Sequence, residues 1–490
     1  MQTNIVFSQF LGGGTGTASD PYRIYNIQHL EILRDSMAAH GGFWNNYSYL
    51  TGKHLRLMND ITDSLTFIIS DYNTPLNAFF HGGGHFINCK ILNNINSNPN
   101  AIFGRVSSYA TIDSLALYGV IYLMKGFTLI NDGLISNCIN NVPLIGLNGT
   151  NLNDEVFGIC HQNVGTLLNC VNNADIITTQ GAGICQSNSG SMINCINNGN
   201  IMGIVQNDIV DVAGLCFALN FENASISNCI NNGNITISGI APYSVIGGLV
   251  CRDYGGGLAN INNSVNTGNI DAKSCYTNGG IIGMGSANVT NCANYGNITN
   301  SQYAGGIFGT NGDAINGHSI VIIENCFNSG EINGINNSGG LVGRIDPIEN
   351  SHLNNCVNIG KVNNTGFALF GNQTNAIYGS PYLTISNNYY DKQMVTKPAT
   401  VIGDIPGQAE GKLTTQLTGI GTELQAMLGN GWSYAEGRYP IPLGLENDSA
   451  AILAATPMYL HFTDTVNFNT VDSVSQDFTV GMENNVAWQV

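Results

Sequence analysis

An eight-residue block, NCINNGNI, occurs twice in this sequence, at residues 194–201 and 228–235. Its first two positions, an asparagine followed by a cysteine or serine, recur at intervals of 25 to 35 residues, about 31 on average. A period in this range is typical of solenoids and propellers, which stack one supersecondary unit per repeat. The second position of the block is occupied by Cys138, Cys170, Cys195, Cys229, Ser264, Cys292, Cys326 and Cys356.

Each repeat also contains short β-type segments separated by turns. In one repeat these segments are GGIFG at 305–309, SIVIIENC at 319–326 and EING at 331–334. Asn and Gly in the turns tolerate positive φ, and no helical period separates the segments. A propeller blade needs about four strands in roughly 40 residues or more. Three short strands in each repeat therefore predict an all-β chain that folds as a right-handed parallel β-helix solenoid.

Stacking of the repeats would turn matching positions into columns. Equivalent positions of successive coils in a parallel β-helix lie about 4.8 Å apart. An inward column must be small and apolar, and a thiol-bearing cysteine behaves as a small buried hydrophobe. Ser264 in the same column indicates that size matters more than sulfur chemistry. We therefore interpret the cysteine column as interior packing, with a disulfide or metal ladder as the alternative, and expect turn asparagines to hydrogen-bond along columns.

The charge composition disfavours several classes of partner. Only 10% of the residues are charged, and the formal net charge is −17. Nucleic acid and anionic membrane surfaces are therefore poor partners on electrostatic grounds. No apolar run reaches the ~18 residues that a membrane-spanning helix needs, so no membrane-spanning segment is predicted. The cysteines form no Cys-x-x-Cys pair of the kind found in zinc ribbons, and no cofactor is predicted.

These repeats resemble a known family. GGLVG at 339–343 and GGIFG at 305–309, together with the Asn-Cys blocks, are similar to the GLUG-type repeats of bacterial adhesin-like surface proteins. Such repeats also occur beside the protease domain of IgA-cleaving metallopeptidases. The resemblance covers roughly 12–443 and includes GGGTGTASDPYRIYNIQHLEILRD (12–35), GKHLRLMNDI (52–61), FFHGGGHFINCKI (79–91), NNYYDKQM (387–394), TTQLTGIGTELQAML (414–428) and WSYAEGRYP (432–440).

The resemblance implies a secreted or cell-surface module that acts as a rigid spacer or as a binding surface for a glycan or a host or cell-surface protein. It implies no enzymatic activity, because family members are mostly binding or scaffold modules. The His-Glu-x-x-His motif of the associated protease is absent from this sequence. The family's entry segment often has Asp-Gly-Asn-Gly-His where this chain has His81-Gly82-Gly83-Gly84-His85.

The two ends of a solenoid need caps, because each end exposes unpaired strand edges. Residues 26–40 carry apolar side chains near a 3.6 period, which predicts an amphipathic helix that covers the first edge, with Asn26 as its N-cap. Residues 380–445 are expected to form a segment that closes the other end, with a short helix around 421–428. The predicted β-helix domain thus comprises residues 1–445.

A linker and an incomplete second domain are predicted after the β-helix. Residues 446–456, ENDSAAILAAT, have the composition of a linker. Residues 457–490 alternate like sandwich strands and resemble the opening strands of a bacterial immunoglobulin-like domain, a partial β-sandwich. So few strands cannot form such a sandwich alone. Either the chain is a fragment of a longer protein, or these strands pair with another copy in self-assembly.

No catalytic or metal site is predicted. His81 and His85 are interpreted as turn residues, because the glycines between them disfavour a helix that would place both imidazoles on one face. The acidic residues interpreted as solvated turns rather than calcium ligands are Asp60, Asp63, Asp208 and Asp211.

Two alternatives to an adhesin-like module stay open. Many parallel β-helices are carbohydrate-active enzymes, polysaccharide lyases or glycoside hydrolases, but a fold alone does not indicate a function. Elimination from uronic acids needs a basic residue, and the basic residues between 131 and 370 recur on no single coil. The other alternative is a structural fibre subunit that assembles by strand exchange. The basic residues between 131 and 370 are Arg252, Lys273, Arg344 and Lys361. Four tyrosines are either binding aromatics or ordinary surface residues: Tyr254, Tyr276, Tyr295 and Tyr303.

Overall fold

The structure is a computed structural model of the 490-residue chain. Two units are distinguished, Met1–Thr456 and Pro457–Val490. The predicted linker and immunoglobulin-like strands lie outside the described residues and stay predictions. The structure describes residues 11–40, 50–92, 101–122, 126–146, 155–254, 258–311, 320–345, 350–363, 365–371 and 380–445.

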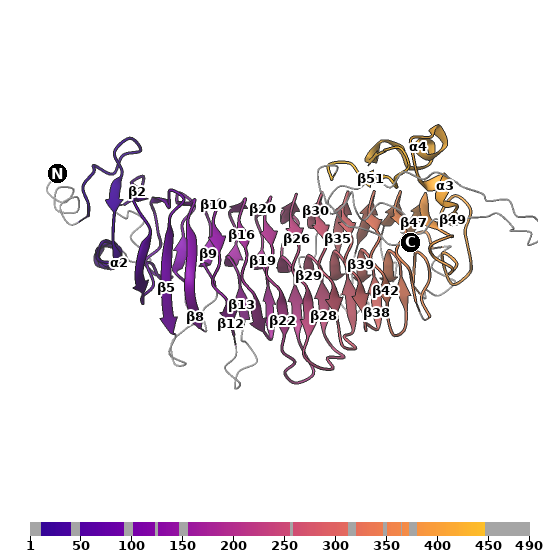
Figure 1. Ribbon diagram of the computed structural model, residues 1–490, viewed down its shortest axis with the longest axis horizontal. Helices are drawn as coiled ribbons and strands as arrows, with labels where there is room; N and C mark the ends of the chain where they lie inside the picture. Colours follow the sequence, from indigo (N-terminus) through magenta and orange to yellow (C-terminus); the bar gives the residue numbers. More distant parts are fainter. Residues whose placement is uncertain are drawn as a thin grey trace, which may run out of the picture. The chain divides into compact units, whose positions relative to one another are not determined.

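The first unit is a parallel β-helix, as predicted. Figure 1 shows its strands side by side, coil after coil, in the order of the sequence. Each strand pairs in parallel with the matching strand of the next coil, so that Leu167 lies opposite Met192 and Met192 lies opposite Ile226. Four sheets, called A, B, D and C in the order in which a coil passes through them, run along the stack.

Sheet A has thirteen strands in the described part of the chain. Its strands are β1 (Tyr22–Ile24), β2 (His54–Leu57), β4 (Phe79–His81), β7 (Thr111–Asp113), β10 (Leu134–Ser136), β15 (Thr166–Leu168), β20 (Ser191–Ile193), β25 (Ser225–Ser227), β30 (Asn260–Asn262), β35 (Ala287–Thr290), β40 (Val321–Glu324), β45 (Ser351–Asn354) and β47 (Leu383–Ser386).

Sheet B receives two strands from most coils, on either side of the Asn-x-Gly turn. Its strands are β3 (Ile61–Leu65), β5 (Phe86–Leu92), β8 (Ala116–Tyr122), β11 (Ile139–Asn140), β12 (Leu144–Ile145), β16 (Val171–Asn172), β17 (Ile176–Thr178), β21 (Ile196–Asn197), β22 (Ile201–Gly203), β26 (Ile230–Asn231), β27 (Ile235–Ile237), β31 (Val265–Asn266), β32 (Ile270–Asp271), β36 (Ala293–Asn294), β37 (Ile298–Thr299), β41 (Phe327–Asn328), β42 (Ile332–Asn333), β46 (Val357–Asn358), β48 (Asn388–Asp391) and β49 (Ala409–Lys412).

Sheets D and C complete the coil. Sheet D contains β13 (Glu155–Phe157), β18 (Gln180–Ala182), β23 (Asp211–Ala213), β28 (Val245–Gly247), β33 (Thr277–Gly279), β38 (Tyr303–Gly305) and β43 (Ser338–Gly339). Sheet C contains β6 (Phe103–Val106), β9 (Thr128–Asn131), β14 (Cys160–Asn163), β19 (Cys185–Asn188), β24 (Cys216–Leu219), β29 (Val250–Asp253), β34 (Ile282–Met284), β39 (Phe308–Thr310) and β44 (Val342–Arg344).

A coil therefore has more strands than the three predicted, because the Gly-Gly block bends. GGIFG was predicted as one strand, but β38 ends at Gly305 and β39 begins at Phe308. A Cβ on Gly305 would lie 1.9 Å from the carbonyl oxygen of Phe308, so the backbone approach at this corner excludes every larger residue. The glycine pair thus makes the corner between sheets D and C.

The core fills the interior of the stack. Inward side chains from successive strands of sheet A, such as Ile135, Leu167, Met192 and Ile226, are fully buried. They belong to one hydrophobic cluster that extends from the first coils to the last. Burial of these aliphatic columns is the main stabilising contribution of the fold.

At the N-terminal end, helix α2 (Ile27–His40) occupies the range predicted to be helical. The Oδ1 atom of Asn26 accepts a hydrogen bond from the backbone N–H of His29 at 3.0 Å, the contact expected of an N-cap. Leu30, Leu33 and Met37 are buried in the same hydrophobic cluster as the first coils. The role of helix α2 as the cap of the first sheet edge stays a prediction.

The predicted closing segment, 380–445, has two parts. The first part adds β47, β48 and β49 to the last coils, and the second part packs on the outer face of sheet B. The second part contains α3 (Thr414–Leu417), α4 (Thr422–Leu428), a 3₁₀ turn (Gly429–Gly431) and the antiparallel pair β50 (Trp432–Ser433) and β51 (Ile441–Pro442). These elements pack beside the strands (Figure 1), with the Trp432 ring 6.4 Å from the Phe327 ring on sheet B.

Candidate functional site

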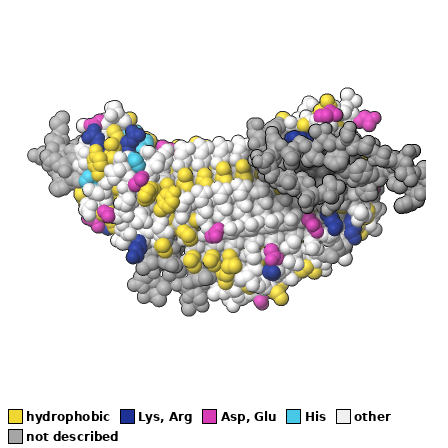
Figure 2. Space-filling model, viewed as in Figure 1, with side chains coloured by type: hydrophobic (Ala, Val, Ile, Leu, Met, Phe, Trp, Pro, Cys, Tyr) yellow, Lys and Arg dark blue, Asp and Glu magenta, His cyan; other side chains and the backbone are white. Residues whose placement is uncertain are grey.

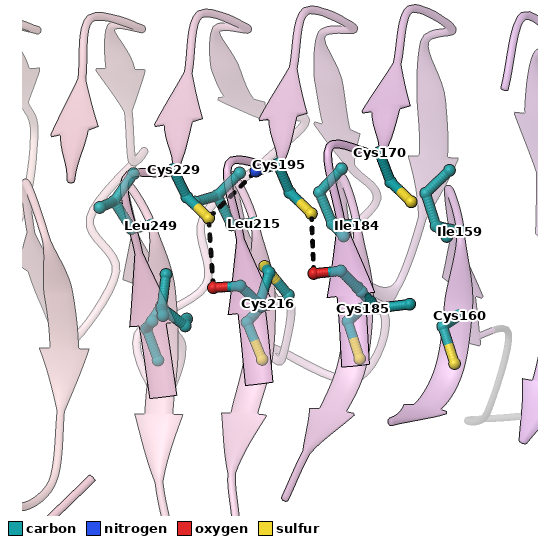
Figure 3. Packing of buried hydrophobic residues seen from close by; sticks show 14 of the residues in the cluster. Ile159, Cys160, Cys170, Ile184, Cys185, Cys195, Leu215, Cys216, Cys229 and Leu249 are labelled. Atoms are coloured by element: carbon teal, nitrogen blue, oxygen red, sulfur yellow. Dashed lines mark hydrogen bonds between the residues drawn. The ribbon is translucent and has the colours of Figure 1, made fainter. Parts of the chain in front are cut away.

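The Asn-Cys block forms the corner between sheets A and B. Asn137, Asn169 and Asn194 each have φ 53°, in the left-handed region that asparagine tolerates better than most residues. The bend directs the next side chain into the interior, and Figure 3 shows Cys170, Cys195 and Cys229 at this corner of successive coils. All eight predicted column residues, Cys138, Cys170, Cys195, Cys229, Ser264, Cys292, Cys326 and Cys356, are fully buried.

These column residues also make hydrogen bonds that sequence reasoning missed. The backbone N–H of Cys195 donates to Sγ of Cys229 at 3.3 Å, and the N–H of Cys229 donates to Oγ of Ser264 at 3.1 Å. Each thiol or hydroxyl donates in turn to a carbonyl, as Cys229 does to Ser227 at 3.3 Å. The column therefore requires a small side chain that can both accept and donate, which cysteine and serine share.

The cysteines are thiols in this structure. All thirteen are free and buried. Burial raises the pKa of the Cys195 thiol well above its usual value, so this group stays protonated and keeps its donor hydrogen. A second cysteine column, Cys160, Cys185 and Cys216, lies on sheet C and gives way to Val250 at the next coil.

The predicted asparagine ladder is present, and it is buried. The Asn140 side chain donates through Nδ2 to Oδ1 of Asn172 at 2.8 Å, and Asn172 donates in the same way to Asn197 at 2.8 Å. Every amide in this ladder is almost completely buried, so the hydrogen bonds compensate for the lost hydration. The ladder continues through Asn231, Asn266, Asn294 and Asn328 to Asn358.

Because these regular columns serve the fold, a candidate binding site is best sought where the side-chain type of a column changes from one coil to the next. One such column runs along sheet C in the order Gln162, Ser187, Ala218, Arg252, Met284, Thr310 and Arg344. Its two arginines are three coils apart, which corresponds to about 14 Å.

Arg252 forms a buried ion pair across the corner with sheet D. Its Nη2 and Nε atoms lie 3.0 and 3.2 Å from Oδ2 of Asp211, and Oδ1 of Asp211 accepts the N–H of Val245 at 2.7 Å. Burial raises the pKa of the Asp211 carboxyl, and the Arg252 guanidinium offsets part of that shift. The interpretation of Asp211 as a solvated turn was therefore wrong, whereas Asp208 is exposed in a turn with φ 64°.

Arg344 belongs to an aromatic group on the same corner. Its guanidinium carbon lies 5.4 Å from the centre of the Tyr303 ring, a cation–π distance, and Nη1 donates to the Tyr303 hydroxyl at 3.5 Å. The Tyr276 ring meets the Tyr303 ring edge-on at 5.2 Å. We call Asp211, Arg252, Tyr276, Tyr303 and Arg344, which form two separate contact groups with arginines three coils apart, the arginine–tyrosine cluster.

This cluster has the chemistry of a binding site. Guanidinium groups donate bidentate hydrogen bonds to carboxylate, sulfate or phosphate groups, and tyrosine rings pack on the apolar faces of sugars or side chains. In Arg252, however, the Nε and Nη2 donors are already bound to Asp211, so of the two arginines only Arg344 is a candidate for such a contact. Of the other tyrosines considered, Tyr254 is exposed, and Tyr295 packs against Phe327.

The remaining candidates from the sequence lie apart from this cluster. His81 and His85 do not face each other, since His81 Nε2 lies 2.9 Å from Nδ1 of His54 and His85 Nδ1 lies 3.1 Å from Oδ1 of Asp60. Lys273 forms an ion pair with Asp271 at 3.0 Å on another part of the coil. In the described residues, no group of three or more His, Cys, Asp or Glu side chains is placed to hold a metal ion.

No helix in the described ranges has both the length and the hydropathy that crossing a membrane requires.

Comparison with known proteins finds a weak structural likeness. No protein-family model and no curated protein match this sequence. A match among solved structures is a crystal structure of a "putative immunoglobulin A1 protease" from Bacteroides ovatus, with a TM-score of 0.35 and 17% sequence identity. The match covers 58% of this chain and 78% of that chain. The parallel β-helix described above rests on the strand pairing of this chain itself.

Proposed function

We propose that this chain is a non-enzymatic, secreted or cell-surface module of the adhesin-like class, a rigid spacer that binds a glycan or a protein at the arginine–tyrosine cluster. The observation that carries the proposal is the placement of Arg344 over Tyr303, with Tyr276 against the same ring. The buried columns of the repeat, by contrast, consist of asparagine amides, cysteine thiols and aliphatic side chains that serve the fold. The resemblance to GLUG-type repeats supports the class, and the hydrogen-bonded columns support the spacer role.

A glycan array and a panel of cell-surface proteins, probed with the purified chain, test the binding role. Tyr303→Ala and Arg344→Ala are each expected to weaken binding at least tenfold, because each removes one half of the cation–π pair. Tyr382→Ala is the matched control, since Tyr382 is 52% exposed and outside the cluster. Equal loss in all three variants, or no loss in any, would contradict this location of the site.

The non-enzymatic assignment is tested on the same preparation. Neutral and uronate-containing polysaccharides are incubated with the chain, and the products are followed by reducing-end release and by the absorbance of unsaturated uronates. We expect no cleavage of either class. Cleavage that is lost in Arg252→Met or Arg344→Ala would assign the cluster to catalysis and would overturn the proposal.

A further inference from the structure

The outer face of sheet B carries two rows of apolar side chains. The first row lies one residue after the cysteine column. Successive side chains of a strand point to opposite faces, so this residue, between the buried cysteine and the buried ladder asparagine, points outward. Over the first coils these side chains are only half-buried. In coil order the first row is Phe86, Ala116, Ile139, Val171, Ile196 and Ile230.

The second row lies at the other edge of the same face. Ile145 and Ile177 are half-buried, and Met202 is 42% exposed. The seven-residue strand β8 pairs with both β11 and β12, so the two rows share one sheet. Tyr118 and Val120 on β8 are 46% and 45% exposed between them.

Further along the stack the first row is covered by the chain itself. The row continues as Val265, Ala293, Phe327, Val357 and Tyr389, each opposite the last. These residues are buried in one cluster with Leu424, Leu428 and Trp432 of the closing segment. The second row becomes polar one coil earlier, at Thr236 in the coil of Ile230, and continues as Asp271 and Thr299.

The uncovered part is thus an apolar face that continues an interface already present in the fold. Figure 2 shows rows of hydrophobic side chains that run along the coils, with mostly uncharged and a few acidic side chains around them. The face spans five intervals of about 4.8 Å in one direction and six residues of about 3.3 Å in the other, roughly 500 Å². Isolated surface hydrophobes need no explanation, but apolar rows that extend over several coils of one face are often functional.

We propose that this face, from Phe86 to Ile230, pairs with the same face of a second copy of the chain. The spacing of the rows favours this partner, because side chains that repeat every 4.8 Å or so interdigitate only with a surface of the same repeat. A two-fold axis that lies in the plane of the interface, perpendicular to the rows, brings each row opposite the same row of the second copy, the arrangement of an isologous dimer. The proposal is independent of the binding function assigned to the arginine–tyrosine cluster.

Between the rows lie a column of asparagines and the exposed Asp175, whose Oδ1 accepts a hydrogen bond from the backbone N–H of Asn200 at 2.8 Å. Lys90 on β5 is also exposed, opposite Val120. Asn173 donates through Nδ2 to Oδ1 of Asn141 at 2.9 Å, Asn198 donates to Asn173 at 2.8 Å, and Asn232 donates to Asn198 at 2.8 Å. These exposed amides therefore keep partners when a second sheet excludes water from them. Two such faces bury about 1,000 Å², at the low end for specific interfaces, so the dimer is weak and concentration-dependent.

Sedimentation velocity of the full chain over a range of concentrations tests the proposal. We expect a reversible monomer–dimer equilibrium. Its dissociation constant should fall as salt is added, because salt screens the repulsion between two chains of net charge −17. Ile196→Glu is expected to raise the dissociation constant at least tenfold, because the two-fold axis places the new charge in the interface twice. Ile322→Glu is the matched control, since Ile322 is also half-buried but lies on sheet A.

A cross-linking variant keeps the test decisive if Ile196→Glu fails to fold. Asn198 is exposed at the middle of the face, and the native thiols are all buried. Under mild oxidation, Asn198→Cys is expected to give a disulfide-linked dimer far faster than Thr384→Cys, an exposed position on sheet A. A wild-type chain that stays monomeric throughout, equal effects of the two glutamate variants, or equal cross-linking of the two cysteine variants would overturn the proposal.

Discussion

The corner cysteine shows how one residue can meet two requirements of a stacked coil. The interior needs a small side chain, and the backbone N–H at the corner needs an acceptor that the neighbouring strands do not supply. Sγ of Cys356 fills this role for the N–H of Cys326 at 3.4 Å, and Oδ1 of Asn388 fills it for Cys356 at 3.2 Å. The column therefore tolerates Cys, Ser or Asn, and the common property is a hydrogen-bonding atom close to the backbone.

Substitution of Cys229 separates these two requirements. Cys229→Ser keeps an acceptor for the N–H of Cys195, whereas Cys229→Val fills the space and leaves that N–H unpaired. We expect the valine variant to be less stable than the serine variant by about 1–3 kcal/mol, the cost of an unsatisfied buried donor. Urea denaturation followed by circular dichroism measures the difference. A valine variant as stable as the serine variant would show that size alone governs the column.

The two asparagine ladders offer a second matched pair. Asn231 is buried, accepts from Asn197 and donates to Asn266, each at 2.8 Å. Asn231→Ala breaks both bonds and is expected to cost about 3 kcal/mol. Asn232→Ala, at an exposed position of the outer ladder, is expected to change the stability by no more than about 0.5 kcal/mol. Comparable losses in the two variants, measured by denaturant unfolding, would refute a special role for the buried ladder.

Loss of Arg252 is expected to make stability depend on pH. The pKa of Asp211 is raised by burial, and removal of its partner raises it further. A carboxyl whose folded pKa is raised destabilises the fold only when ionised, so the cost is small below its unfolded pKa of about 3.9 and grows as pH rises above it. At neutral pH, Arg252→Met is expected to lose about 3–5 kcal/mol, as for other broken buried pairs.

The control for this pH dependence is the double variant Asp211→Asn with Arg252→Met, in which no charge is left to titrate. Its stability relative to wild type is expected to vary much less between pH 4 and pH 7. Thermal unfolding across that range checks both variants. A single variant that is equally destabilised at both ends of the range would contradict the burial of an ionised Asp211.

At the scale of elements, the last part of the closing segment is held in place by its packing on sheet B. Its helices and β50–β51 pair carry Leu424, Leu428 and Trp432 onto sheet B, where the outward row is apolar. Asp391 fastens the segment to the last coil, because Oδ2 accepts hydrogen bonds from the hydroxyls of Thr414 and Tyr439. The segment thus behaves as a strap along one side of the stack.

Leu428→Ala is expected to loosen this strap without unfolding the coils. Leu428 is 1% exposed, and truncation of a buried leucine costs about 2–5 kcal/mol. Hydrogen–deuterium exchange should therefore rise across residues 414–445 and stay unchanged across 134–231. Leu413→Ala, at a side chain that is 40% exposed, should change neither region. Faster exchange throughout the chain would show that the strap and the coils unfold together.

Sequence reasoning predicted the strands of sheet A and the corner better than the other elements. The Asn-Cys spacing reports the period directly, whereas the corner at Gly305 depends on a backbone contact with Phe308 that no local pattern specifies. The position of the strap was not predictable, because Val171 in the open half and Phe327 in the covered half occupy the same position of the repeat. The pairing of Asp211 with Arg252 joins residues 41 apart and depends on the coil lengths between them.

At the scale of the whole molecule, the β-helix is a stack of nearly identical neighbours. Each coil contacts chiefly the coils before and after it, so stability accumulates from coil to coil as in other solenoids. A regular stack gives a rigid surface on which a few changed residues, such as Arg252 and Arg344, mark the site that we propose. The period of the sequence predicts this architecture. The proposed site is recognised only when the strand register is known, because the register places Arg252 and Arg344 in one column of sheet C.

The central claim is that successive repeats stack in parallel and in register. A column at the surface, Asp175, Asn200, Asn234, Asn269, Asn297 and Glu331, allows its test. From Asn200 onward, each backbone N–H in this column donates to the side chain one coil earlier.

Nitroxide labels on cysteines placed at Asp175 and at one further position of this column report the stacking by pulsed electron paramagnetic resonance. Pairs of Asp175 with Asn269, Asn297 and Glu331 are separated by three, four and five coils, or about 14, 19 and 24 Å between backbones. We expect the measured distances to increase by that coil spacing from one pair to the next. Distances that do not increase with the number of coils would contradict the stacked fold and the interpretation built on it.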